Sequence, residues 1–155
     1  MKKLIMPVLC ASLIGFILGY FMFKQYDGLR TIIPVNAESK TLYFIQQGVY
    51  SSMENVEKNT TSFQNYIYQQ ENDKYYVYIG ITKYKENAEK IKEYYKQQGY
   101  ITYIKEISIN NQEFIETLEQ YDALISQTTD TSTYPTICNQ VLTKYKELVT
   151  IDNKN

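Results

Sequence analysis

Tyr43–Lys58 reads YFIQQGVYSSMENVEK, and Tyr75–Lys90 repeats its pattern as YYVYIGITKYKENAEK. The two copies align Gly48 with Gly80 and end on the similar segments ENVEK and ENAEK. A pattern that recurs within one chain indicates a repeated supersecondary unit. Two copies are too few for a solenoid, so they predict a compact domain with two similar halves.

Each copy predicts the order strand, turn, helix, strand. Alternating aromatic and β-branched residues lead to the glycine, a polar turn follows, and apolar residues then recur three and four apart. The closing strands are expected at Asn65–Tyr68 and Gly99–Ile104, with Glu71–Lys74 as the turn between the halves. Two such halves predict an α+β fold of the βαββαβ type, with a four-stranded antiparallel sheet and both helices on one face.

The side chains of the central strands divide between the two faces of the expected sheet. Ile45, Val77 and Ile79 are expected to pack on the helices, whose apolar positions need an apolar partner. The opposite face is expected to stay uncovered and to carry Phe44, Gln46, Tyr76 and Tyr78. An exposed group of aromatic side chains with an amide among them is typical of a binding surface.

The composition argues against several classes of function. The formal net charge is −1 and the chain contains no histidine. Nucleic-acid binding usually requires a basic surface, and histidine is the commonest general base and zinc ligand. We therefore expect no nucleic-acid partner, no metal, no cofactor and no enzymatic activity. Cys10 and Cys138 are expected as small apolar side chains, with an intermolecular disulfide as the alternative.

Residues 1–24 are expected to form a transmembrane anchor. Leu4–Phe23 carries no charge, and as a helix it would span about 30 Å, the thickness of the hydrocarbon core of a bilayer. Lys2 and Lys3 favour a cytoplasmic N-terminus, which places the rest of the chain outside the cytoplasm in a single-pass arrangement. A cleaved signal peptide is the alternative, for which Val35–Ala37 resembles a small-residue cleavage site, although it lies over ten residues past the apolar run.

Small residues within this segment suggest how two copies could meet in the membrane. Ala11, Gly15 and Gly19 lie four apart, and such a stripe lets two membrane helices approach closely. A homodimer through this stripe is one reading, and the general frequency of glycine in membrane helices is the other.

Three further regions follow the anchor: a linker at 25–40, the repeat domain at 41–107 and a helical extension at 108–155. The extension predicts one helix over Asn111–Ser126 and a second that opens at Tyr134 after Thr133 as its N-cap. These helices could pack as a hairpin on themselves or on the domain, or dock a partner of the division or sporulation machinery. They could also cover the open sheet face.

The strands of the repeat domain resemble those of the SPOR (sporulation-related repeat) family. Ile45, Gln46, Gly48 and Tyr50 match the pattern of the first strand in that family, and Val77–Gly80 matches the third. Gln47 stands where the family usually has an apolar residue, so the phase of the first strand is expected to shift near Gly48.

The resemblance implies a ferredoxin- or ribonucleoprotein-like fold that binds the glycan strands of bacterial peptidoglycan during cell division or sporulation. It implies contacts on the open sheet face from Phe44, Gln46, Tyr66, Tyr68, Tyr76 and Tyr78. Tyrosine rings offer flat apolar area to sugar rings, and a glutamine amide can donate and accept hydrogen bonds.

Three other readings stay open. The chain could be a scaffold that binds partner proteins through its C-terminal helices, a nucleic-acid binder of the same general fold, or a cell-wall hydrolase that uses carboxylates. With 17 tyrosines, any single tyrosine could also be a core residue without a role in binding.

Overall fold

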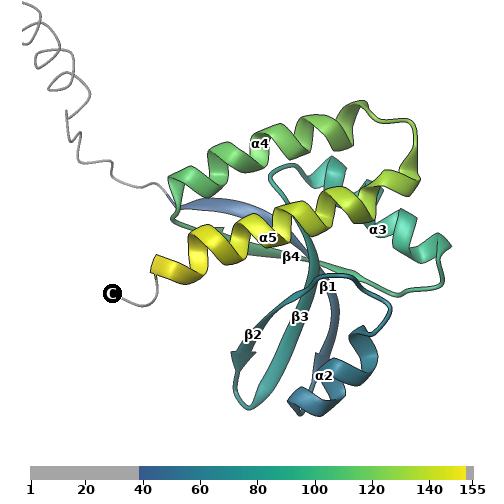
Figure 1. The fold of residues 1–155 in the computed structure, drawn as a ribbon, viewed down its shortest axis with the longest axis vertical. Coiled ribbons are helices and arrows are strands. Elements are labelled where there is room, and N and C mark those ends of the chain that lie inside the picture. The colour runs from purple at the N-terminus through teal and green to yellow at the C-terminus, as the bar shows by residue number, and fades with distance from the viewer. Residues whose placement is uncertain (1–38, 153–155) are drawn as a thin grey trace, which may run out of the picture. The chain divides into compact units, whose positions relative to one another are not determined.

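The computed structural model describes residues 39–152, with side chains as far as residue 149. The elements in order are β1 (Lys40–Tyr50), α2 (Met53–Thr60), β2 (Ile67–Glu71), β3 (Lys74–Thr82), α3 (Lys85–Gln97), β4 (Tyr103–Ile109), α4 (Gln112–Gln127), a 3-10 turn at Thr131–Thr133 and α5 (Tyr134–Asp152). Strand and helix therefore alternate twice, as the repeat predicts, before two further helices follow (Figure 1).

The four strands form one antiparallel sheet in the order β2-β3-β1-β4. β1 lies in the centre, where it pairs with both β3 and β4. The predicted α+β class and the four-stranded antiparallel sheet are confirmed, and the strand order is compatible with a ferredoxin-like arrangement.

The pairing of β1 with β3 is irregular in the middle of the strand. The register shifts between Ile45 and Gln46 and again between Gln46 and Gly48. Such bulges bend a strand and change the direction of its side chains. The expected shift of phase near Gly48 is confirmed.

The hairpin between β2 and β3 turns at Asn72 and Asp73, which have positive φ angles of 48° and 58°. Two consecutive residues of this kind suit a tight hairpin turn, and asparagine and aspartate adopt that conformation more readily than most residues. Glu71 pairs directly with Lys74. The predicted turn is confirmed.

The fourth strand begins later than the sequence pattern predicts. The backbone N–H of Tyr100 donates to Tyr95 O at 2.9 Å, and Gly99 adopts a φ of 86°, so the end of α3 still fixes the chain here. Strand pairing starts at Tyr103 and runs to Ile109. The expectation of a strand over Gly99–Ile104 is therefore wrong in its start and its end.

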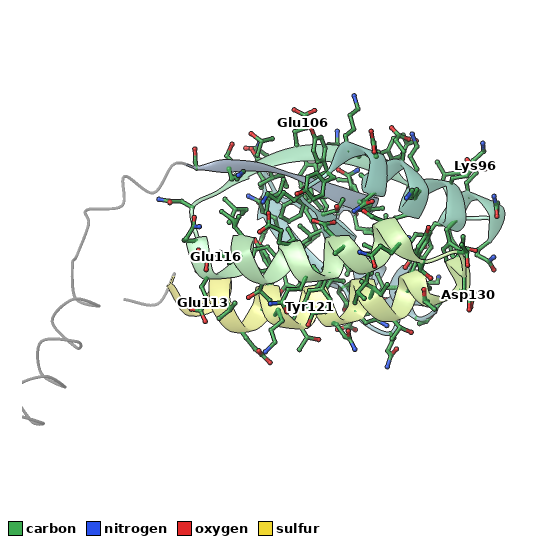
Figure 2. All side chains as sticks on the ribbon, turned by 90° about the horizontal axis from the view of Figure 1, so that it is seen from above. Lys96, Glu106, Glu113, Glu116, Tyr121 and Asp130 are labelled. Atoms are coloured by element: carbon green, nitrogen blue, oxygen red, sulfur yellow. The ribbon has the colours of Figure 1, made fainter. Side chains whose placement is uncertain are left out.

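Helices α4 and α5 pack against each other, and α5 also packs on β3. Figure 2 shows the two helices side by side along one side of the sheet, with Glu106 of β4 pointing away on the other. The predicted bounds of α4 hold to within a residue, and the side chain of Asn111 caps its start by accepting from Phe114 N at 2.8 Å. The hydroxyl of Thr133, the expected N-cap of α5, donates to Asp130 O at 2.7 Å.

The expectation of an uncovered sheet face is wrong, because α5 covers it. The ring of Phe44 meets the ring of Tyr145 from α5 edge-on at 5.8 Å, and Tyr145 in turn meets Phe114 from α4 at 5.3 Å. Gly80 lies so close to Cys138 of α5 that an added Cβ would sit 3.1 Å from the Cys138 sulfur. Of the three arrangements left open for the C-terminal helices, the structure shows the packed one that closes this face.

The predicted anchor at 1–24 and nearly all of the predicted linker at 25–40 lie outside the described residues, as do Cys10 and the small-residue stripe. Within residues 39–152, none of the helices has the length and apolar character needed to cross a bilayer.

Candidate functional site

Three of the six residues expected to contact a ligand lie in the core. Phe44 is 1 % exposed, and Gln46 and Tyr78 are each 5 % exposed. Phe44 and Tyr78 contact each other edge-on at 5.3 Å beneath α5. The ring of Phe44 meets Tyr145 of α5 instead of solvent. Gln46 on the same strand and Tyr78 on the neighbouring β3 are buried as well.

Burial affects the acidity and the hydrogen bonding of side chains on this covered face. Removal from water raises the pKa of the Tyr78 hydroxyl. The side-chain oxygen of Gln46 is buried without a hydrogen-bond partner. The family resemblance assigns Gln46 a role in binding, but burial keeps this side chain away from a ligand in the structure.

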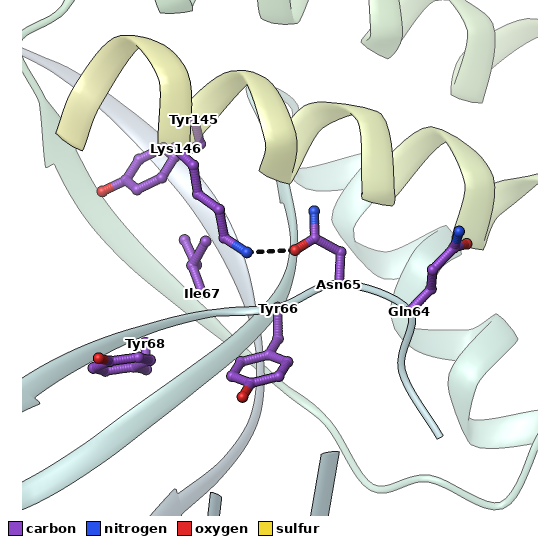
Figure 3. Close-up of a pocket in the computed structure, with 7 residues that line it drawn as sticks. All are labelled: Gln64, Asn65, Tyr66, Ile67, Tyr68, Tyr145 and Lys146. Atoms are coloured by element: carbon purple, nitrogen blue, oxygen red, sulfur yellow. Dashed lines mark hydrogen bonds between the residues drawn. The ribbon is translucent and has the colours of Figure 1, made fainter. Parts of the chain in front are cut away.

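The three remaining tyrosines are more accessible, and two of them line a groove. The groove runs between α5 and the segment leading into β2 and has a volume of about 540 Å³ (Figure 3). Its lining consists of Gln64, Asn65, Tyr66, Ile67, Tyr68, Tyr145 and Lys146. Of the residues expected to contact a ligand, Tyr66 and Tyr68 both line this groove. The half-buried Tyr76 lies on β3 and is not part of the lining.

The groove has one wall from each of two segments that are far apart in the sequence, and hydrogen bonds hold these walls together. The amide nitrogen of Asn65 donates to Asn139 O at 3.2 Å and to the Thr143 hydroxyl at 3.1 Å. The amide nitrogen of Asn139 donates to the side-chain oxygen of Gln64 at 2.7 Å. The loop before β2 is therefore fixed on α5, which gives the groove a defined shape.

Lys146 carries the positive charge of the groove. Its ammonium donates to the side-chain oxygen of Asn65 at 2.5 Å and lies 5.9 Å from the centre of the Tyr66 ring, within range of a cation–π interaction. Partial burial lowers the pKa of Lys146, although the residue as a whole is exposed and such a lysine keeps its charge at neutral pH. Figure 3 shows this contact, with the rings of Tyr66 and Tyr68 along the neighbouring strand.

Tyr145 connects the groove to the core. Its ring packs between Phe44 and Phe114, and burial raises the pKa of its hydroxyl. Tyr68, by contrast, is 48 % exposed and contacts only the ring of Tyr75 among the aromatic side chains described, at 5.8 Å. The groove therefore combines a fixed aromatic floor with an accessible aromatic rim.

The sequence pattern missed the contribution of α5. Tyr145 lies on the apolar side of the predicted helix, which identifies it as a packing residue, and Lys146 is one of many exposed lysines. Gln64 and Asn65 lie in the predicted loop before β2 and carry no motif. The one available signal is the spacing of Tyr66 and Tyr68, which places both rings on the same side of a strand.

The arrangement suits binding of a polar, ring-shaped ligand. Aromatic rings, side-chain amides and one ammonium can engage the faces and the polar groups of a sugar. Among the residues that the structure describes, no three His, Cys, Asp or Glu side chains come together in a way that could hold a metal ion. Comparison with family models, with curated proteins and with solved structures gives no match, so the resemblance to the SPOR family rests on the strand motifs alone.

Proposed function

We propose that this protein is a membrane-anchored, extracytoplasmic protein that binds peptidoglycan glycan strands in bacterial cell division or sporulation, without changing any bond in them. The observation that carries this proposal is the groove between β2 and α5, where three tyrosine rings, two amides and an ammonium converge. The resemblance of the strand motifs and the apolar N-terminal run support it independently.

The groove replaces the sheet face as the site of binding in this proposal. Phe44, Gln46 and Tyr78 are closed off by α5, so a glycan cannot reach them while that helix stays in place. Tyr66 and Tyr68 are accessible at the edge of the sheet, and an open groove can accept a chain of sugars that continues beyond the contact on both sides.

The packing of α5 on the sheet argues against two of the alternative functions, nucleic-acid binding and a protein scaffold. A ribonucleoprotein-type nucleic-acid binder stacks bases on aromatic side chains of the central strands, and here Phe44 and Tyr78 lie beneath α5. A scaffold that docks partners through the apolar sides of its C-terminal helices would need those sides free. Leu118, Ile125 and Leu142 are instead buried in the core.

Co-sedimentation with purified bacterial sacculi tests the proposal. The full chain in detergent micelles is mixed with intact sacculi and with sacculi whose stem peptides an amidase has removed. We expect the double variant Tyr66→Ala/Tyr68→Ala to lose about tenfold or more in affinity, since it removes two large aromatic contact surfaces, and burying one such side chain is worth about 1.5–3 kcal/mol.

Tyr103→Ala is the matched control. Tyr103 is an exposed tyrosine on β4, at the opposite edge of the sheet from the groove, so its loss should leave binding unchanged. Failure of the wild-type chain to sediment with either preparation would reject the proposal. Equal losses in both variants would show that the groove is not the site.

A further inference from the structure

We propose that Lys146 gives the groove a carboxylate-binding subsite, so that the protein selects acidic glycans over neutral ones. This inference rests on the proposed glycan binding and adds the chemical class of the preferred ligand. It also assigns a specificity-determining residue to α5, which lies outside the part of the chain that carries the family resemblance.

The first argument is the lack of an ionic partner. Among the described side chains, no carboxylate forms an ion pair with Lys146. Its ammonium donates to the neutral Asn65 oxygen and lies beside the Tyr66 ring. Lys144, two positions earlier on the same helix, forms an ion pair with Glu147 at 2.6 Å. The charge of Lys146 is therefore available to a ligand, while that of Lys144 is already matched.

The second argument is position. Lys146 lines the groove, and its contact with Asn65 holds the ammonium on the wall beside Tyr66. An ammonium has three donors, and the described structure assigns one of them to Asn65. A sugar that stacks on the tyrosine rings would bring a ring substituent toward the remaining donors.

The third argument is electrostatic. The groove removes part of the solvent around the ammonium, and a cation that has lost solvent gains more from an anion than one fully in water. A carboxylate attached to the sugar meets this need without changing how the rings stack. A neutral sugar offers the ammonium hydroxyl oxygens as acceptors but no opposite charge.

Titration calorimetry with two chemically matched ligands tests the inference. One ligand is the set of glycan strands that an amidase releases from sacculi, which carry lactyl carboxylates. The other is the same preparation after conversion of its carboxylates to neutral amides. The full chain in micelles should bind the acidic strands about three- to tenfold more tightly, which is the range for a single partly exposed charge contact, and added salt should reduce this preference.

Three variants locate the effect. Lys146→Gln should lose the preference while still binding both ligands, Lys146→Arg should retain it, and Lys144→Gln should behave as the wild type. Equal wild-type affinity for the two ligands would overturn the subsite while leaving glycan binding intact. A preference for the acidic strands that survives in Lys146→Gln would also overturn the subsite. Absence of binding to both ligands would reject glycan binding itself, and the subsite with it.

Discussion

Asp122 is a fully buried carboxyl group that joins α4 to the end of β3. The Thr82 hydroxyl donates to its Oδ1, the backbone N–H of Lys83 donates to Oδ2 at 2.8 Å, and the Asn87 amide donates to Oδ1 at 3.0 Å. Burial raises the pKa of Asp122, while these hydrogen bonds act in the opposite direction. The side chain thus fixes the turn between β3 and α3 at an energetic cost that depends on pH.

The raised pKa gives a prediction for stability. A carboxyl group that binds its proton more tightly in the folded state stabilises the fold most at low pH, and this contribution is lost as pH rises through the raised pKa. Asp122→Asn has no such titration. We expect the free energy of unfolding of the wild type, minus that of Asp122→Asn, to fall with rising pH above the ordinary carboxyl pKa of 3.8 and then to level off.

Urea unfolding of both proteins over a series of pH values from about 3.5 to 7 measures this difference. Glu119→Gln serves as a control of opposite sign, since Glu119 on the same helix pairs with Lys83 at 2.5 Å and this contact lowers its pKa. The stability of the wild type minus that of Glu119→Gln should rise with pH. For Asp122→Asn, a difference that grows with pH would show that the hydrogen bonds outweigh burial and would contradict the prediction.

At the scale of elements, the contact of α5 with the sheet depends on the absence of a side chain at position 80. A Cβ added to Gly80 would lie 3.1 Å from the Cys138 sulfur and 3.3 Å from Ile45 Cδ1. Both distances are shorter than ordinary van der Waals contacts, so the Cys138 sulfur and the Ile45 methyl group would have to move by a few tenths of an ångström. Gly80 is part of the strand motif on which the family resemblance rests. In this structure it also allows α5 to pack closely on β3.

Gly80→Ala should therefore destabilise the domain by about 1–3 kcal/mol, the usual cost of overpacking a core. Cys138→Ala removes the sulfur that the new methyl group would meet. In the double variant Gly80→Ala/Cys138→Ala, we expect a smaller loss than the sum of the two single losses, with a coupling of about 1 kcal/mol. Denaturant unfolding of the four proteins gives the cycle, and strictly additive losses would mean that the two residues are not in contact in solution.

The elements themselves were predictable where local chemistry decides them. The turn at Asn72 and Asp73 and the cap at Asn111 follow from side chains that favour those conformations. The start of β4 was missed because Ile101 and Tyr103 continue an apolar alternation, although Ile101 is 76 % exposed and precedes the strand. There, the termination of α3 at Gly99 overrides the pattern.

The covered sheet face could not be predicted for a different reason. The apolar side of a helix such as α5 indicates that it packs on something, but the pattern is the same for a partner protein, a second helix or this sheet. The pattern predicts Tyr145 to be a packing residue whichever of these partners the helix has. The groove depends on this long-range choice, so only its strand side, with Tyr66 and Tyr68, was accessible from the sequence.

At the scale of the whole molecule, α5 takes part in both the core and the groove. Cys138 packs at Gly80, the adjacent Asn139 bonds to the loop before β2, and Tyr145 and Lys146 line the groove. A ligand that contacts the two walls of the groove would therefore hold α5 on the sheet. A ligand that binds Phe44, Gln46 and Tyr78 would instead require α5 to leave.

The reactivity of Cys138 distinguishes these two modes of binding. Its thiol is buried and its pKa is raised to about 12, so a thiol reagent at pH 8 can react only when the protein opens. In a Cys10→Ser background, Cys138 is the only cysteine in the chain. We expect glycan strands at about 100 times their dissociation constant to slow modification of Cys138 by up to about a hundredfold, because binding stabilises the closed state by about 2.7 kcal/mol. The same reaction in concentrated urea should not respond to glycan, which controls for direct effects on the reagent. Faster modification in the presence of glycan would place the binding site beneath α5 and return the assignment to the sheet face.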